Sequence, residues 1–251
     1  MTQPPAIPFE LQDHAIGQRM CGAAALCMVY RSFGLLLTQA EVWETIARND
    51  ASGNRAGRTY LLAADALRRG LTALVLQARR PWQTLAACWS AGVRVILNHR
   101  VRPSSLRGHF SVLAGLSDEQ AWLHDPAIGP AQPIARADLL LLWSAIRGSE
   151  IAGQVLVAVA QPHDPTRTAA AATVANAPGD RDTSASCTLC GARPAESVRC
   201  AGCGRAVPLS PSAALGCPKW DCTGRLWTRL FCPHCDTVLI ELPAAPPEST
   251  D

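Results

Sequence analysis

Cysteine is the residue type in this sequence with the most chemistry to offer, and its positions fall into two classes. Eight of the eleven cysteines lie between positions 187 and 235, in the close pairs "CTLC", "CAGC", "CPKWDC" and "CPHC". The other three, Cys21, Cys27 and Cys88, are scattered. Paired thiolates are typical metal ligands, whereas a lone thiolate at a helix start can be a nucleophile. The two classes are therefore separate candidate sites.

Cys21 stands at the start of a predicted helix in "CGAAALCMVYRSFG", which ends at Phe33 with Gly34 as the C′ glycine. Free backbone N–H groups and the helix dipole stabilise a thiolate at that position and lower its pKa. Gly22 beside it would let a substrate backbone approach closely. Cys27 points to a different face of the helix, and we expect Cys27 and Cys88 to be core residues.

A catalytic cysteine needs a histidine base and a group that orients the histidine. His109 opens the strand-like run "GHFSVLAGL", and Asp125 follows the run "QAWLH". If these strands pair as a hairpin around the turn "SDE", His109 and Asp125 fall at the same open end, where a carboxylate can hold an imidazole tautomer. The competing bases are His99, before a polar loop, and His124, which should face away from Asp125.

Taken in order, the motifs "CGAAALCMVYRSFG", "GHFSVLAGL" and "HDPAIG" resemble the papain-like peptidases that process double-glycine leader peptides of bacteriocins. The run "GRTYLLAADALRRGLTALVL" resembles the second helical unit of that family. The resemblance extends over residues 10–160. It implies a papain-like fold and a cysteine peptidase in which Cys21 is the nucleophile, His109 the general base and then acid, and Asp125 the orienting group.

The resemblance also implies an upstream glutamine that donates to the oxyanion together with the Cys21 backbone N–H. In the family this glutamine usually lies about five or six positions before the cysteine. Here Gln18 lies three positions before Cys21, and Gln12 lies nine before it. We favour Gln18, because a short loop can fold back over the thiol, and keep Gln12 as the alternative.

The four close cysteine pairs are typical of structural zinc sites, in which four thiolates surround one ion. Two zinc ions are implied, and a segment this small needs such cross-links to fold. Nine residues between the first two pairs suit a tight hairpin, so we favour sequential pairing, with zinc ribbons at 187–203 and 217–235. Cross-braced pairing, first pair with third, is the alternative, and an iron–sulfur cluster is the alternative to zinc. The candidate ligands are Cys187, Cys190, Cys200, Cys203, Cys217, Cys222, Cys232 and Cys235.

The C-terminal module is predicted to recognise protein rather than nucleic acid. Its basic side chains and two zinc ions balance its acidic side chains and eight thiolates, so little affinity would come from counterion release. Trp220, Trp227 and Phe231 form either an exposed recognition patch or the small core of the second ribbon. We expect the module to bind the substrate protein or a separate protein partner.

The elements that must position these residues are helices first and mostly strands later. Segregated helices with an antiparallel sheet give the α+β class. Residues 161–186 are rich in Ala, Thr, Pro and Asp and are predicted to be a flexible linker, with a short helix at 168–175 as the alternative. The chain should thus divide into a papain-like domain at 1–160, this linker, and a double zinc-ribbon domain at 187–242. Helices are predicted at 21–33, 38–49, 58–69, 80–91 and 135–146, and strands at 71–77, 93–99, 108–116, 120–124 and 153–160.

Composition argues against several classes of protein. The net charge of +3 is too small to indicate binding to nucleic acid or to a membrane surface. No segment approaches the ~20 consecutive apolar residues of a membrane span, and the first residues lack the pattern of a signal peptide. We therefore expect a soluble, cytoplasmic protein, and the resemblance to peptidases that process bacteriocin leader peptides implies a bacterial one.

The sequence as a whole predicts a cysteine peptidase that cleaves after small residues of a protein or leader-peptide substrate. Two other functions fit the same residues. One is a catalytically silent, peptidase-like adaptor that binds peptides. The other is a transamidase that forms the same thioester and passes the acyl group to an amine.

Overall fold

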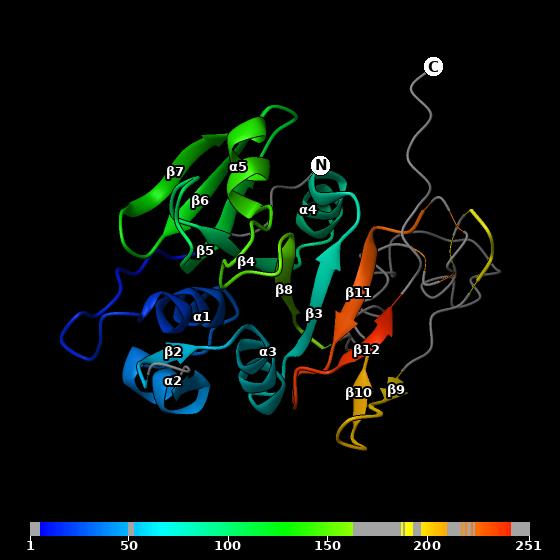
Figure 1. Cartoon of the computed structure of the whole chain (residues 1–251), viewed down its shortest axis with the longest axis horizontal. Helices are drawn as coiled ribbons and strands as arrows, with labels where there is room; N and C mark the ends of the chain where they lie inside the picture. The colour runs from blue at the N-terminus through cyan, green and yellow to red at the C-terminus, as the bar shows by residue number, and fades with distance from the viewer. Residues whose placement is uncertain are drawn as a thin grey trace, which may run out of the picture.

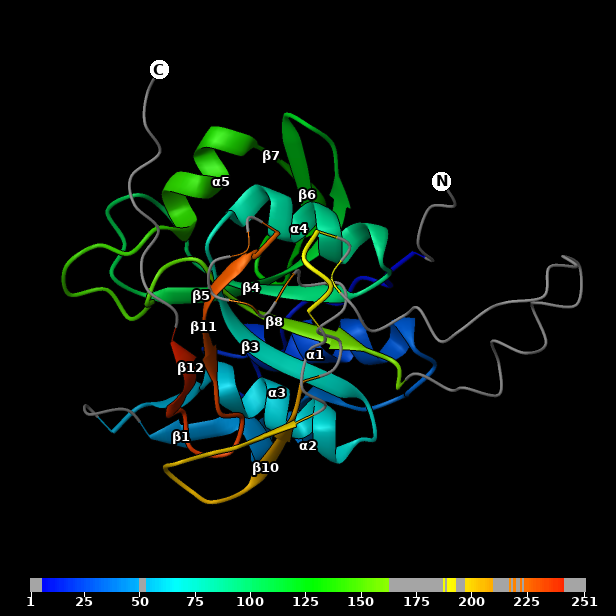
Figure 2. The ribbon, with the colours of Figure 1, turned by 90° about the vertical axis from the view of Figure 1, so that its right-hand side faces the viewer.

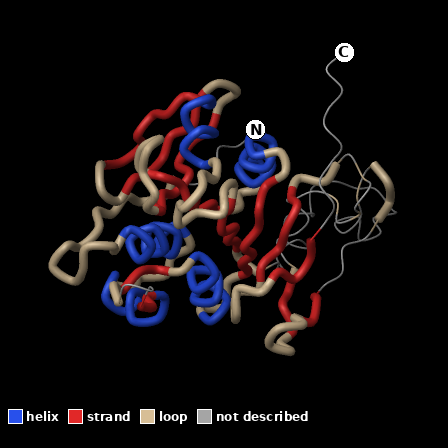
Figure 3. Tube along the Cα trace, viewed as in Figure 1, coloured by secondary structure: helices blue, strands red, loops and turns tan. Residues whose placement is uncertain are grey.

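The computed structural model describes residues 6–49, 53–162, 187, 189–192, 197–209, 217, 219, 222 and 224–241. The predicted linker falls almost wholly outside these residues, from 163 to 186, and so do Trp220 and the C-terminal tail from 242 onward. Figure 3 shows the strands in the middle of the molecule with helices on both sides of them.

Three N-terminal helices pack together on one side of the molecule: α1 (Cys21–Ser32), α2 (Gln39–Ile46) and α3 (Thr59–Arg68). The apolar sequence of α1 is buried from Cys21 to Tyr30. The α2 helix begins with the expected capping box, in which the Glu41 N–H donates to Thr38 Oγ1 and the Thr38 N–H donates to the Glu41 carboxylate. A short hairpin, β1 (Ala47–Asn49) and β2 (Arg55–Gly57), follows α2 where a longer helix was predicted.

One eight-stranded antiparallel sheet organises the molecule, in the order β12-β11-β3-β8-β4-β5-β6-β7. The β5–β6 pairing is the predicted hairpin, with its turn at 117–119. The strand bounds are β3 (Thr72–Ala78), β4 (Arg94–Arg100), β5 (Gly108–Leu116), β6 (Gln120–Asp125), β7 (Gly129–Ala135), β8 (Val155–Ala160), β11 (Trp227–Phe231) and β12 (Val238–Glu241).

Helices cover both faces of the sheet, and successive residues of a central strand pack into the two different cores. On β3, Val75 joins the core beneath α1, α2 and α3, while Leu74 and Leu76 join the core beneath α4 (Pro81–Ser90) and α5 (Arg136–Trp143). Figure 2 shows these two groups of helices on opposite sides of the strands. Because successive side chains of a strand point to opposite faces, the continuous apolar run of β3 fits a strand buried on both sides.

Strand β7 is not among the predicted elements, and it contains Pro130 and Pro133, which are rare inside a sheet. It lies at the edge of the sheet, bonded only to β6. Proline is tolerated there because an edge strand leaves half of its N–H groups without a ladder partner.

The C-terminal strands β11 and β12 extend the sheet of the N-terminal part instead of folding apart from it. Strand β11 pairs with β3, and β12 pairs with β11 (Figure 1). Trp227 is 4% exposed and packs in the core beneath α4, while Phe231 packs beside the core beneath α3. A separate two-stranded sheet, like that of β1 and β2, joins β9 (Ser197–Arg199) to β10 (Ala206–Pro208). The predicted domain boundary stays a prediction, but the sheet extends across it.

The observed architecture confirms the α+β class, with N-terminal helices and a large antiparallel sheet. Among the described helices, none has the length and apolar content that crossing a bilayer requires.

Candidate active site and metal centres

Cys21 is the first residue of α1 and is 8% exposed, with Met20 at the N-cap. The backbone N–H groups in this first turn have no partners within the helix, so they can stabilise negative charge on the thiol or on a bound oxyanion. Gly22 also has a packing role: a Cβ there would lie 3.2 Å from the Phe110 ring, so glycine lets α1 pack closely on β5.

His109 and Asp125 meet at the end of the β5–β6 hairpin. The Nε2 atom of His109 lies 2.8 Å from Asp125 Oδ1, and both side chains are nearly buried. Asp125 Oδ1 also accepts a hydrogen bond from the Ala127 N–H, which fixes the carboxylate. Nε2 of His109 faces Asp125, and the Cys21 side chain lies near enough to the same ring to raise its pKa. The structure thus places Cys21, His109 and Asp125 in one row.

The electrostatics of this row favour a charged imidazole. Burial by itself lowers the pKa of His109, but the hydrogen bonds to Asp125 and Cys21, together with their charges, raise it to about 10. Burial raises the pKa of Asp125, and the opposing effects of His109 and the Ala127 N–H bring that pKa below its usual value. An imidazolium between a carboxylate and a thiolate is the state in which cysteine is nucleophilic at neutral pH.

Replacing Asp125 with asparagine should move the alkaline limb of the pH–rate profile to lower pH. The carboxylate raises the pKa of His109, so its loss lowers that pKa, and the imidazolium then loses its proton at lower pH. We expect a shift of ~1–3 pH units and a lower maximal rate. The test is to measure kcat/KM for peptide cleavage as a function of pH. If the alkaline limb does not shift, Asp125 does not control the pKa of His109.

The competing histidines already have backbone or hydroxyl partners on both ring nitrogens. His99 lies across from His109 on β4, with ring centroids 5.5 Å apart, and bonds to Ser111 Oγ and the Arg100 carbonyl. Burial, aided by the charge of His109, lowers the pKa of His99 to about 4. His124 bonds to the Ile7 carbonyl and the Ala131 N–H. Neither ring has a nitrogen left for Cys21.

The two candidate glutamines lie in different places. Gln18 is exposed, and within the described part of the chain its side chain makes no hydrogen bond. The Gln12 backbone N–H donates to the Pro126 carbonyl, one residue beyond Asp125, and its side chain contacts His14. Neither side chain is hydrogen-bonded to Cys21, so the identity of the oxyanion donor remains a prediction.

Glu150 is a residue of this site that the sequence reasoning missed. Its Oε2 atom accepts hydrogen bonds from Arg19, two residues before Cys21, and from the N–H of Gly108, one residue before His109. Glu150 therefore ties together the two segments that carry the thiol and the imidazole. A lone glutamate in the loop before β8 gives no sequence signal of this contact, because only the fold brings residues 19, 108 and 150 together.

A cavity of about 460 Å³ adjoins these segments and is shared with the C-terminal module. Gly108 and Phe110 line it from β5, and Arg19 and Glu150 line its edge. The wall opposite includes side chains from the C-terminal module, namely Phe231 and Asp236.

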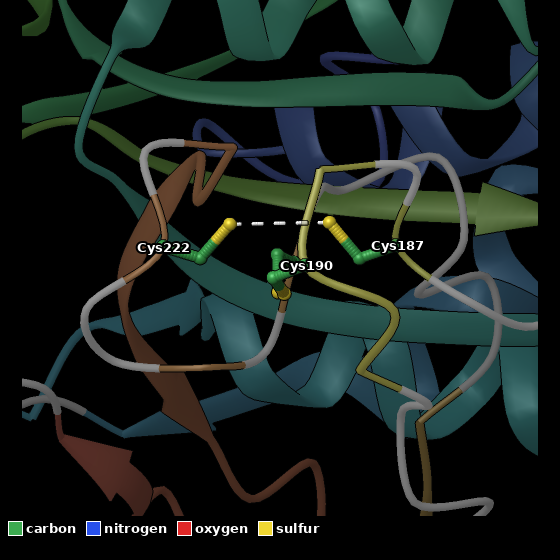
Figure 4. A group of neighbouring side chains, drawn as sticks. Cys187, Cys190 and Cys222 are labelled. Carbon is green, nitrogen blue, oxygen red and sulfur yellow. Dashed lines mark hydrogen bonds between the residues drawn. The ribbon is translucent and has the colours of Figure 1, made fainter.

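The eight paired cysteines form two groups of four, each able to hold a metal ion. The sulfurs of each group lie within 4.8 Å of one another. Sulfur–sulfur distances within the groups run from 3.3 Å for Cys190–Cys217 to 3.9 Å for Cys187–Cys222, and four sulfurs bound tetrahedrally to one zinc at ~2.3 Å would be ~3.8 Å apart. Figure 4 shows Cys187 and Cys222 of the first group with their sulfurs facing each other and Cys190 beside them. The groups are Cys187, Cys190, Cys217, Cys222 and Cys200, Cys203, Cys232, Cys235.

The pairing is cross-braced, so the sequential pairing that the sequence favoured is wrong. The first cysteine pair joins the third, and the second joins the fourth. The reason is that a hairpin presents its cysteine pair at its own turn. Cys200 and Cys203 lie in the turn between β9 and β10, and Cys232 and Cys235 lie in the turn between β11 and β12. Two such turns must face each other to supply four ligands.

Three solved peptidases resemble this chain. One is a double glycine motif protease from an AMS/PCAT transporter in complex with the leader peptide, at 18% identity, over 63% of this chain and 94% of that chain, with a TM-score of 0.43. The peptidase domain of Streptococcus ComA, a bi-functional ABC transporter, has 15% identity, 62% and 99% coverage and a TM-score of 0.47. A putative C39-like peptidase from Bacillus anthracis has 14% identity, 63% and 96% coverage and a TM-score of 0.48.

By sequence, no protein family model and no curated protein matches the chain. The chemistry proposed below therefore rests on the side chains of this chain.

Proposed function

We propose that the protein is a cysteine peptidase in which Cys21 is the nucleophile, His109 the general base and acid, and Asp125 the group that orients His109. The observation that supports the proposal most is the 2.8 Å contact between His109 and Asp125, with Cys21 at a helix N-terminus near enough to the same imidazole to raise its pKa. A nucleophile, a base and an orienting group in hydrogen-bond contact are the parts that acyl transfer needs.

Peptide cleavage would proceed in two halves. In the first, the Cys21 thiolate attacks the scissile carbonyl carbon, and the His109 imidazolium gives its proton to the departing amine, leaving a thioester on Cys21. In the second, neutral His109 takes a proton from water as that water attacks the thioester. The products are a carboxylic acid and the free thiol. The Cys21 N–H would stabilise both oxyanions, with Gln18 as our proposed second donor and Gln12 as its alternative.

The substrate class that we propose is a protein or leader peptide cleaved after small residues such as Gly-Gly. This part follows from the resemblance of the sequence motifs to double-glycine peptidases. We propose that the C-terminal module contributes to substrate recognition, because Phe231 and Asp236 line the cavity beside Gly108. The proposed division is a peptidase domain at 1–160 and a metal-binding domain at 187–242, joined by a linker.

We propose zinc as the ion of both four-cysteine groups, because four thiolates at tetrahedral spacing are its usual structural ligands. When bound, zinc would cross-link the turns and take no part in peptide cleavage. None of the eleven cysteines is in a disulfide. Cysteines in this number without disulfides, with a proposed nucleophile among them, fit a reducing compartment, so we propose that the protein works in the cytoplasm.

The proposal is tested by the rate at which Cys21 reacts with iodoacetamide at pH 7. Cys27 and Cys88 are the internal controls, because burial raises the pKa of each thiol to about 12. We expect Cys21 to be alkylated at least ~100-fold faster than either, since it alone among the three pairs with an imidazolium. Mass spectrometry of the tryptic peptides assigns each site. If Cys21 reacts no faster than Cys27, the adaptor function is favoured instead.

A further inference from the structure

A hollow of about 550 Å³ lies beside the proposed active site and is rich in arginine. Three guanidinium groups, from Arg19, Arg55 and Arg107, contribute to its lining. The other lining residues that matter here are Gln18, Trp43 and Glu150. We refer to it as the arginine hollow.

Positive charge exceeds negative charge in the arginine hollow. Glu150 is the only carboxylate among its described lining residues, and it already accepts hydrogen bonds from Arg19 and from the Gly108 N–H. Arg107 is exposed, and its side chain has no hydrogen-bond or ion-pair partner within the described part of the chain. A carboxylate that entered the hollow would therefore meet a guanidinium that is not yet neutralised.

Arg55 is held ready for the same kind of ligand. Its guanidinium lies over the Trp43 ring, 5.6 Å from the ring centre, and Trp43 is 4% exposed, so the ring is a fixed platform. Arg55 also contacts Glu44, which does not line the hollow, at 3.3 Å, and both of those side chains are largely exposed. An exposed pair of this kind contributes little, so a better-placed carboxylate can compete for Arg55.

The arginine hollow lies close to Cys21 and His109, because the segment before each of these residues contributes an arginine to its lining. Arg19 lies two residues before Cys21, and Arg107 lies two residues before His109. Two residues of chain span at most ~7 Å. A peptide whose scissile carbonyl lies at Cys21 thus has its neighbouring side chains within reach of the hollow.

We propose that the arginine hollow is a substrate subsite that takes one acidic side chain, Asp or Glu, close to the bond that is cleaved. The inference rests on the proposed function and adds a specificity to it. Guanidinium groups bind carboxylates through two parallel hydrogen bonds, which makes them selective for an acid over the corresponding amide. Arg107 and Arg55 are the residues that would determine this preference.

The test uses internally quenched peptides with a central Gly-Gly pair and either one Glu or one Gln at each neighbouring position in turn. At the position that occupies the hollow, we expect the wild-type protein to cleave the Glu peptide about tenfold more efficiently than the Gln peptide. Arg107→Gln should reduce that ratio several-fold, and Arg55→Gln combined with it should bring the ratio close to one. Raising the salt concentration should also lower the wild-type ratio.

Arg48→Gln is the matched control, because it removes one positive charge from a different hollow, between α2, α3 and the C-terminal module. It should keep the wild-type ratio. If Arg48→Gln lowers the Glu-to-Gln cleavage ratio as much as Arg107→Gln does, the preference depends only on the net charge of the protein, and the proposed subsite is wrong. Equal cleavage of Glu and Gln peptides at every position would also overturn it.

Binding to the Cys21→Ala variant separates this inference from the proposed function. Fluorescence anisotropy with the same peptides, labelled at one end, measures affinity without cleavage. If no peptide is cleaved by the wild type but the Glu peptide still binds more tightly than the Gln peptide, the subsite holds and the peptidase proposal fails. If peptides are cleaved without any Glu preference in rate or affinity, the peptidase proposal holds and the subsite fails.

Discussion

Replacing Cys21 with serine is expected to lower kcat/KM for peptide cleavage by at least ~10³-fold while leaving the fold intact. A serine hydroxyl keeps its proton at neutral pH, so the charged pair with His109 is lost, and with it the nucleophile. The substitution is nearly isosteric and stands at a helix start, so packing changes little. Cleavage of a Gly-Gly peptide, followed by mass spectrometry, measures the loss. Thermal unfolding and metal content should match those of the wild type.

Cys27→Ala provides the matched control for that experiment. It removes another thiol from the same helix, six positions further on, where the side chain is fully buried. It should cost some stability, since it leaves a small cavity in the core, but kcat/KM should stay near the wild-type value. Cleavage that persists in Cys21→Ser, or that disappears in Cys27→Ala at a temperature where the variant is folded, would contradict the assignment of Cys21.

Replacing Cys203 with serine is expected to destabilise the whole protein rather than only its C-terminal part. Cys203 is exposed, so the substitution removes a metal ligand with little effect on packing. The opposing ligands, Cys232 and Cys235, lie in the turn between β11 and β12, and β11 pairs with β3 of the main sheet. Structural zinc contributes ~10–16 kcal/mol to the folding of isolated metal modules, so we expect a loss of several kcal/mol in the free energy of unfolding.

Chelation supplies the control for the Cys203 experiment. With a strong zinc chelator in excess, the wild type and Cys203→Ser should unfold at the same temperature, because both then lack the ion. Calorimetry measures the two transitions, and elemental analysis should find one ion fewer per chain in the variant. A difference in stability that persists under chelation would mean that Cys203 acts through packing and would refute the metal assignment of that group.

The chemistry-bearing residues of the proposed site were visible in the sequence because each carries a local signal. Cys21 starts an apolar helix, His109 starts an alternating strand, and Asp125 precedes a proline at the end of the next strand. A two-strand hairpin with a short turn has its register set locally, so the predicted approach of His109 and Asp125 needed no knowledge of the rest of the fold. The oxyanion donor lacks such a signal, since a loop glutamine is positioned only by tertiary contacts.

The sequence predictions failed where contacts between distant segments decide the structure and the local sequence pattern does not. Strand β7 contains two prolines, which the sheet tolerates because β7 lies at its edge. The predicted pairing of the candidate metal ligands was wrong. The short spacing between the first two cysteine pairs indicated that they share one ion, but each hairpin turn places its own pair opposite another turn. Spacing along the chain does not report which turns face each other.

The sequence by itself predicted the α+β class, which the structure confirms, and it supplied the candidate Cys-His-Asp residues and the eight cysteines of the two candidate metal centres. These features depend on hydrophobic periodicity, helix and turn signals, and short cysteine spacings, all of which are local. Only the tertiary structure decided that β11 and β12 join the main sheet, that the cysteines are cross-braced, and that Glu150 ties the segment of Cys21 to that of His109. Each of these is a contact between segments distant in sequence, settled by which surfaces bury apolar area and which backbone groups find partners, and no local pattern specifies that outcome.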